Sequence, residues 1–209
     1  MAPVLALPPS RCDDCGLRRG DCLCPELPRL SVATRVVLLT HRAERRKSTN
    51  TGRLVARLLV GAEVRVRGER DGTPRPPLPA GRRLVLYPER DARVLSRADA
   101  EGGPVVLLVP DGNWNQARRC YRRDPDARGC EIVRLPETGP GRYPLRRGAA
   151  PDRLCTLEAV ARALGLLEGP ALAAELEGWL ARFVERSLRA AGRGPGRGVE
   201  GPRGRGVAG

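Results

Sequence analysis

Short apolar runs recur along the chain and are separated by stretches with the spacing of amphipathic helices. Five segments rich in β-branched and aliphatic residues predict strands: TRVVLLTH (34–41), EVRVRG (63–68), LVLYP (84–88), VVLLV (105–109) and EIVRL (131–135). Helices are predicted after the capping residues at 48–50, over about 90–100, and over 155–167 and 170–191. Strands alternating with helices indicate an α/β fold, with a mostly parallel sheet and helices on both faces.

Polar motifs follow three of these strands directly. They are HRAERRKSTNTGRL, LYPERDA and PDGNWNQARR, and a fourth motif, LCTLEAVA, begins a later helix. In an open α/β sheet, ligands bind in the crevice beyond the carboxyl ends of the strands, so these motifs are candidate ligand sites. No dinucleotide-binding glycine pattern follows the first strand, and the sequence contains neither a P-loop nor a recognisable serine-hydrolase nucleophile elbow.

The segment DGNWNQARR (111–119) is the most informative of these motifs. Pro110 is expected to end the strand, Asp111 to cap the next helix, and Gly112 to let the backbone approach a ligand. The alternative is an ordinary helix start in which Trp114 anchors the core. His41, the sole histidine, also lies at a strand end, where it is either a functional residue or a hydrogen-bonded structural one.

Four cysteines near the N-terminus have the spacing C-x2-C-x6-C-x-C: Cys12, Cys15, Cys22 and Cys24. Four thiolates within thirteen residues predict a closed tetrahedral zinc site with a structural role, although the final C-x-C departs from the usual paired C-x2-C. The absence of a signal-peptide pattern and of an apolar run of membrane-spanning length favours a cytoplasmic protein with reduced cysteines.

The formal net charge is +14, and all basic residues but Lys47 are arginines. Most of this excess lies outside 192–209, an Arg/Gly-rich tail expected to be disordered. An excess of cations favours a polyanionic partner through phosphate contacts. Because aromatic residues are few, a structured RNA fits better than a single strand stacked on aromatic rings. The alternative is a solvated basic surface without a partner.

Together these motifs resemble the DTW-domain family of tRNA-uridine aminocarboxypropyltransferases. The resemblance runs from about Cys12 to the final helix and comprises the cysteine set, TNTGRL, LYP, DGNW with QARR, and YPLR leading to TLEAVA. It implies a SPOUT-like fold with a C-terminal trefoil knot, divided into a zinc knuckle (1–31), a catalytic domain (32–191) and the tail (192–209). It also implies S-adenosylmethionine as donor, transfer of its 3-amino-3-carboxypropyl group to N3 of a tRNA uridine, and release of methylthioadenosine.

The resemblance assigns roles to individual residues. Asp111 is the catalytic candidate, either as general base for N3 or as a partner of the donor's ammonium or sulfonium group. The implied donor-binding residues are Thr49, Asn50, Thr51, Gly52, Arg53, Leu86, Tyr87, Pro110, Asn113, Trp114, Thr156 and Glu158. The arginines expected to contact RNA are Arg18, Arg19, Arg118, Arg119, Arg146 and Arg147.

Two positions depart from the family pattern: Asn113 replaces the motif threonine, and Cys155 stands where serine is frequent. Two other functions fit the same sequence. A SPOUT-like RNA methyltransferase would use the same donor but release S-adenosylhomocysteine, and a zinc-bearing RNA-binding protein would perform no chemistry. The sequence predicts no membrane partner and does not determine the oligomeric state.

Overall fold

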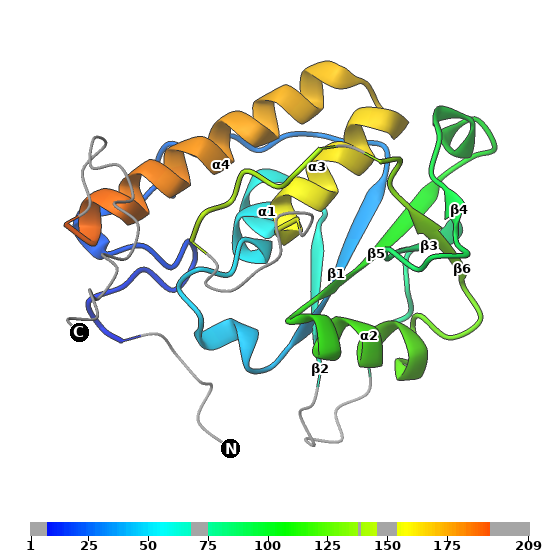
Figure 1. Cartoon of the computed structure of the whole chain (residues 1–209), viewed down its shortest axis with the longest axis horizontal. Helices are drawn as coiled ribbons and strands as arrows, with labels where there is room; N and C mark the ends of the chain where they lie inside the picture. The colour runs from blue at the N-terminus through cyan, green and yellow to red at the C-terminus, as the bar shows by residue number, and fades with distance from the viewer. Residues whose placement is uncertain (1–7, 68–74, 138, 146–153, 193–209) are drawn as a thin grey trace, which may run out of the picture.

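The computed structural model describes residues 8–67, 75–137, 139–145 and 154–192, and within them six strands form one parallel sheet (Figure 1). The strands are β1 (Arg35–His41), β2 (Glu63–Arg67), β3 (Arg82–Leu86), β4 (Arg93–Val94), β5 (Val105–Asp111) and β6 (Glu131–Arg134). Their order is β2-β1-β5-β3-β6-β4, and every pairing is parallel. The predicted parallel sheet is therefore confirmed.

Helices cover both faces of the sheet, as predicted. In Figure 1, α1 (Gly52–Leu58), α3 (Thr156–Leu167) and α4 (Pro170–Ala190) lie on one side, and α2 (Trp114–Arg123) lies on the other. Alternate residues of the central strands feed two apolar cores: Leu38 and Leu107 pack toward α1 and α3, whereas Leu39 and Leu108 pack toward α2. Burial on both faces explains why β1 and β5 are continuous apolar runs.

The prediction of a helix over 90–100 is wrong. This stretch contains β4 and the 3-10 turn η3 (Arg97–Ala100). Asp99 accepts hydrogen bonds from the backbone nitrogen of Ser96 at 2.9 Å and from Arg93 at 2.8 Å. These local contacts close one short turn and leave Arg93 in an edge strand beside β6, so helical propensity does not decide the segment.

The strand that precedes DGNW is longer than predicted. β5 continues through Pro110 to Asp111, because beyond Leu108 it pairs with β1 alone and a proline is tolerated on an unpaired edge. Asp111 therefore does not cap α2. The cap is Asn113, whose side-chain oxygen accepts from the backbone nitrogen of Gln116 at 2.9 Å, while the Gln116 side chain accepts from Asn113 at 2.8 Å.

The cysteine segment packs against the rest of the protein. Leu17 and Leu23 are buried in the same apolar core as α1, α3 and α4. A second 3-10 turn, η1 (Arg19–Asp21), contacts α4, and a third, η2 (Glu44–Arg46), follows β1. Arg186 of α4 donates to the carbonyl oxygen of Cys22 at 2.9 Å and pairs with Glu26 at 2.7 Å.

Several predictions lie outside the described residues. Among them are the disordered tail beyond residue 192 and the positions of Arg146 and Arg147. The trefoil knot stays a prediction, since segment 146–153 of the predicted knotted half is not described. Across the described ranges, no helix combines the length and apolar character that crossing a membrane requires.

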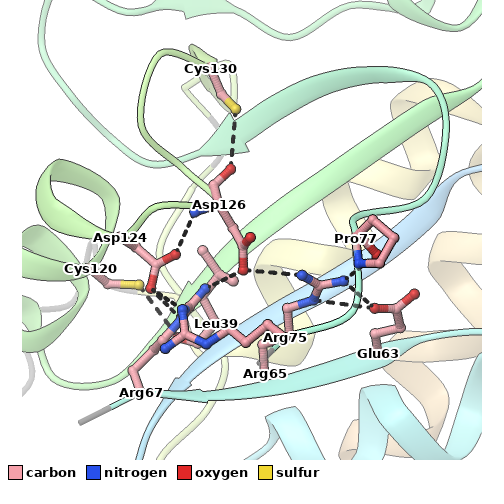
Figure 2. A network of polar contacts seen from close by, with 10 residues as sticks. All are labelled: Leu39, Glu63, Arg65, Arg67, Arg75, Pro77, Cys120, Asp124, Asp126 and Cys130. Atoms are coloured by element: carbon pink, nitrogen blue, oxygen red, sulfur yellow. Dashed lines mark hydrogen bonds and ion pairs between the residues drawn. The ribbon is translucent and has the colours of Figure 1, made fainter. Parts of the chain in front are cut away.

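Two buried arginines of β2 connect the edge of the sheet to the loop after α2 (Figure 2). Asp126 accepts from Arg67 at 2.6 Å and from Arg65 at 3.2 Å, and Asp124 pairs with Arg67. Arg65 and Arg67 are only 7% and 6% exposed. Removing the carboxylate from a buried ion pair leaves an uncompensated charge in a poorly solvated place.

We expect Asp126→Asn to lower the free energy of unfolding by about 2 kcal/mol, because two buried guanidinium groups lose a shared anion and keep only Asp124 and Glu63 as partners. Urea denaturation measures this value. Glu131→Gln is the matched control, since Glu131 pairs with Arg82 and Arg93 at a site where all three side chains are more than 40% exposed, and its loss should cost at most about 1 kcal/mol. Equal effects of the two substitutions would contradict this account of the network.

Candidate functional site

The buried carboxylate of Asp111 stands at the carboxyl end of β5, in the middle of the sheet. Its Oδ2 accepts hydrogen bonds from Thr40 Oγ1 at 3.0 Å and from Asn50 Nδ2 at 2.8 Å. Its Oδ1 accepts from Thr156 Oγ1 at 2.6 Å. Three uncharged donors from β1, the TNTGR turn and the first turn of α3 therefore converge on one carboxylate, which joins segments distant in the sequence.

The TNTGR turn (49–53) fits closely around this carboxylate. A Cβ on Gly52 would lie 2.8 Å from Asp111 Oδ2, so only glycine lets the turn approach so near. Thr51 Oγ1 accepts from the backbone nitrogen of Leu157 at 3.2 Å. Arg53 donates to the carbonyl oxygens of Asp13 and Arg45. The polar side chains of the turn therefore form hydrogen bonds with α3, the cysteine segment and the loop after β1.

A cavity of about 1070 Å³ is lined by Pro110, Gly112 and Thr156, which neighbour or contact Asp111, but not by Asp111 itself. It lies beyond the carboxyl ends of β3, β5 and β6 and is closed by the start of α3, which is the place where open α/β sheets bind ligands. Its volume is at the upper end of the range usual for small-molecule sites. Five of the residues predicted to bind the donor line it: Leu86, Tyr87, Pro110, Trp114 and Thr156.

Aromatic rings form one wall of this cavity. The ring centroids of Tyr87 and Trp114 are 5.9 Å apart at an interplanar angle of 62°, and Tyr121 packs behind Tyr87 at 4.2 Å. Burial raises the pKa of Tyr87, which keeps its hydroxyl protonated. These are three of the six aromatic side chains in the chain, so the wall is a concentrated surface for a flat ring.

Charged side chains line the mouth of the cavity. Glu89 accepts a hydrogen bond from Tyr121 Oη, which lowers the pKa of Glu89, and the positive charges of Arg122 and Arg118 lower it further. The other charged residues that line the cavity are Arg90, Arg134, Glu137 and Arg162. Glu89 and Arg90 belong to the LYPERDA motif that the sequence singled out, whereas the residues after β6 carried no signal, because their position depends on β6 lying beside β3.

The remaining predicted donor-binding residues do not line the cavity. Thr49, Asn50, Thr51, Gly52 and Arg53 form the turn behind Asp111, and Asn113 caps α2. Glu158 is buried and accepts from the backbone nitrogens of Cys155, at 2.7 Å, and Arg142. His41 lies nearby, with Gln116 Nε2 3.1 Å from its Nδ1. These residues make a supporting layer around the cavity.

The four N-terminal cysteines meet at one point. Their sulfur atoms all lie within 4.8 Å of one another, with 3.7 Å between Cys12 and Cys24 and 3.8 Å between Cys15 and Cys22. Thiolates bound tetrahedrally at about 2.3 Å from zinc are about 3.8 Å apart, so the set fits this ion. Burial opposes ionisation of Cys12, but backbone hydrogen bonds and neighbouring thiols bring its pKa to about 7.

The arginines predicted to contact RNA divide between two places. Arg18 and Arg19 are exposed on the cysteine segment, where Arg19 Nε donates to the carbonyl oxygen of Pro9 at 2.8 Å. Arg118 and Arg119 are exposed on the outer side of α2. The two pairs are therefore carried by different elements of the protein.

We expect Cys24→Ser to lower the zinc content from about one ion per chain toward zero and to destabilise the N-terminal segment, because three thiolates bind the ion more weakly than four. Elemental analysis and thermal unfolding measure both effects. Cys130→Ser is the control, since Cys130 lies outside the cluster and should leave the metal content unchanged. Full zinc occupancy in Cys24→Ser would disprove the four-sulfur site.

Comparison with known proteins places the chain in a family. It is 32% identical over 177 residues to tRNA-uridine aminocarboxypropyltransferase 2 of Drosophila melanogaster, covering 79% of this chain and 70% of the relative. The proteins of the same name from Macaca fascicularis and Mus musculus are 30% and 29% identical over 75% of this chain. The chain spans little more than half, 56%, of the length of these two relatives.

Among solved structures, the chain is similar to the SAM-dependent rRNA:acp-transferase of Vulcanisaeta distributa, with a TM-score of 0.45 and 22% identity over 79% of this chain and 90% of that one. The profile of the DTW domain matches residues 9–188, which include the cysteine cluster, the Asp111 carboxylate and every described wall of the cavity. The resemblance expected from the motifs is confirmed, and the chain belongs to the DTW domain family.

Proposed function

We propose that this protein transfers the 3-amino-3-carboxypropyl group of S-adenosylmethionine to N3 of a uridine in tRNA and releases methylthioadenosine. The observation that carries the proposal is that family motifs far apart in the sequence converge on one cavity. LYP contributes Tyr87, DGNW contributes Trp114, and the start of TLEAVA contributes Thr156. The names of the relatives support aminocarboxypropyl transfer to a tRNA uridine as the reaction, and the cavity is the candidate site for it.

The cavity suits the two flat ring systems of such a reaction. We assign the adenosine of the donor to the wall formed by Leu86, Tyr87, Pro110 and Trp114, where aromatic and apolar surface favours a purine. The ionised Glu89 at the rim is placed to attract the positive charge of the donor's ammonium or sulfonium group. Arg90 at the same rim offers a cation for the donor's carboxylate.

The reaction requires the uridine nitrogen to be held in line with one particular carbon of the sulfonium. As the bond from N3 to the terminal carbon of the aminocarboxypropyl chain forms, the bond from that carbon to sulfur breaks, and its electron pair makes sulfur a neutral thioether. The proton of N3 leaves to a base or to water. Because three carbons surround the sulfonium, the shape of the cavity selects the product.

We assign Asp111 a positioning role in this reaction. A general base must reach the substrate, whereas Asp111 is 3% exposed, is not among the residues that line the cavity, and accepts hydrogen bonds from Thr40, Asn50 and Thr156. Thr156 also lines the cavity. Asp111 therefore holds the wall of the site from behind, and its ionised carboxylate adds a negative potential there.

A turnover assay tests the proposed reaction. Incubation with unmodified tRNA and labelled S-adenosylmethionine should yield labelled 3-amino-3-carboxypropyluridine and methylthioadenosine, both measured by mass spectrometry. S-adenosylhomocysteine would identify a methyltransferase instead, and neither by-product would identify a binding protein without this chemistry. Trp114→Ala should lower turnover at least tenfold because it removes part of the purine wall, whereas Trp179→Ala, on α4 outside the cavity, should not.

A further prediction distinguishes a positioning role of Asp111 from a general-base role. We expect Asp111→Asn to lower the free energy of unfolding by about 2 kcal/mol, because its amide nitrogen would face donors that now bind a carboxylate. It should also reduce turnover at every pH without changing the shape of the pH–rate profile. Asp91→Asn, an exposed aspartate after β3, is the control. Loss of the basic limb of the profile in Asp111→Asn would instead identify Asp111 as the general base.

A further inference from the structure

The outer face of α2 is a row of arginines. Asn115, Arg118, Arg119, Arg122 and Arg123 line a shallow depression of about 300 Å³, on the side of the helix away from Ala117 and Tyr121, which pack on the sheet. Residues three and four apart lie next to one another on a helix, so the four guanidinium groups are close neighbours. We call these five residues the arginine face.

The arginine face is largely uncompensated. Within the described residues, neither an ion pair nor a hydrogen bond occupies the guanidinium groups of Arg118, Arg119 and Arg123. Of the four arginines, Arg122 has hydrogen-bond or ion-pair partners in the described part of the chain, namely Tyr121 Oη at 2.9 Å and Glu89 at 3.7 Å. Like charges at these spacings repel, so the helix carries a cost that an external anion would remove.

The acids closest in sequence do not reduce this charge. Asp124 and Asp126 follow α2 directly, but Figure 2 shows both turned toward Arg65 and Arg67 of β2. The side chain of Asp124 is 5% exposed. Arg122 and Arg123 lie in the last turn of α2, where the helix dipole stabilises positive charge. Arg118 and Arg119 lie a turn earlier, where this stabilisation is small.

The arginine face also adjoins the proposed active site through one helix. Trp114 and Ala117 of α2 line the cavity, and the charges of Arg118 and Arg122 act on Tyr87 and Glu89 at its wall and rim. A polyanion lying on the arginine face would therefore lie one helix away from the cavity. The five residues include no aromatic ring, which favours backbone phosphates over stacked bases as the contacted groups.

We propose that the arginine face of α2 binds the phosphate backbone of a structured RNA stem and thereby presents a nearby nucleotide to the cavity. This inference rests on the proposed function for the identity of the RNA as tRNA. The contacts are electrostatic and independent of base sequence, because guanidinium groups bind phosphate oxygens in bidentate geometry and release condensed counterions. Arg122 and Arg123 thus join Arg118 and Arg119 as RNA-contacting residues.

The test measures the Kd of the protein for tRNA by fluorescence anisotropy over a range of salt concentrations, without donor. The triple variant Arg118→Gln, Arg119→Gln, Arg123→Gln should bind at least tenfold more weakly, and its salt slope should fall by about three units, one for each lost phosphate contact. The corresponding triple lysine variant should keep most of the slope, since it keeps the charge.

The matched control is the triple variant Arg97→Gln, Arg182→Gln, Arg189→Gln, which removes the same charge from η3 and α4. It should retain the salt slope within about one unit. An equal loss in both triple variants, or an unchanged slope in the α2 variant, would overturn the proposal. So would an equal or greater loss of affinity for an unstructured oligonucleotide of the same length, because this would indicate single-strand binding.

These outcomes are separate from those of the reaction. If wild-type protein forms methylthioadenosine but the α2 variant binds tRNA normally, the arginine face is wrong and the function stands. If no by-product forms but the α2 variant alone loses affinity, the surface stands and the function is wrong. Thermal unfolding of both triple variants should match wild type, which excludes misfolding as the cause of weaker binding.

Discussion

The buried carboxylate of Asp111 is the interaction on which the candidate site depends. Burying a charge without partners is costly, and here Thr40, Asn50 and Thr156 offset the cost with hydrogen bonds of 2.6–3.0 Å. Each donor comes from a different segment, so the carboxylate holds β1, the TNTGR turn and α3 against the end of β5. Gly52 makes this possible because no side chain separates the turn from the carboxylate.

Two parts of the protein are connected to the Asp111 site. On one side, Thr51 and Arg53 connect the turn to α3 and to the cysteine segment, which α4 secures through Arg186. On the other side, α2 begins three residues after Asp111, presents Trp114 to the cavity and carries arginines outward. The cysteine cluster is thus joined to the Asp111 site by short polar contacts, and the basic surface is joined to it by the chain that continues from β5 into α2.

The departure of this chain at Asn113 has a structural explanation. Asn113 caps α2 and forms a reciprocal capping box with Gln116. Asparagine caps helices at least as well as threonine, so the substitution keeps the start of α2 in place. Cys155 occupies the corresponding position before α3, where Glu158 accepts from its backbone nitrogen at 2.7 Å. At both positions the side chain of the third helical residue accepts a hydrogen bond from the backbone nitrogen of the residue that precedes the helix.

The sequence by itself determined most of the strands, the cysteine cluster and the motifs that carry the site, because apolar runs, cysteine spacing and turn residues are local signals. It failed over 90–100, where the polar contacts of Asp99 override helical propensity, and at Asp111, where a common capping residue serves as a buried acceptor. Only the tertiary structure decided which segments surround the cavity. Strand order places β3, β5 and β6 side by side, and that order depends on long-range packing of buried faces, which no local pattern records.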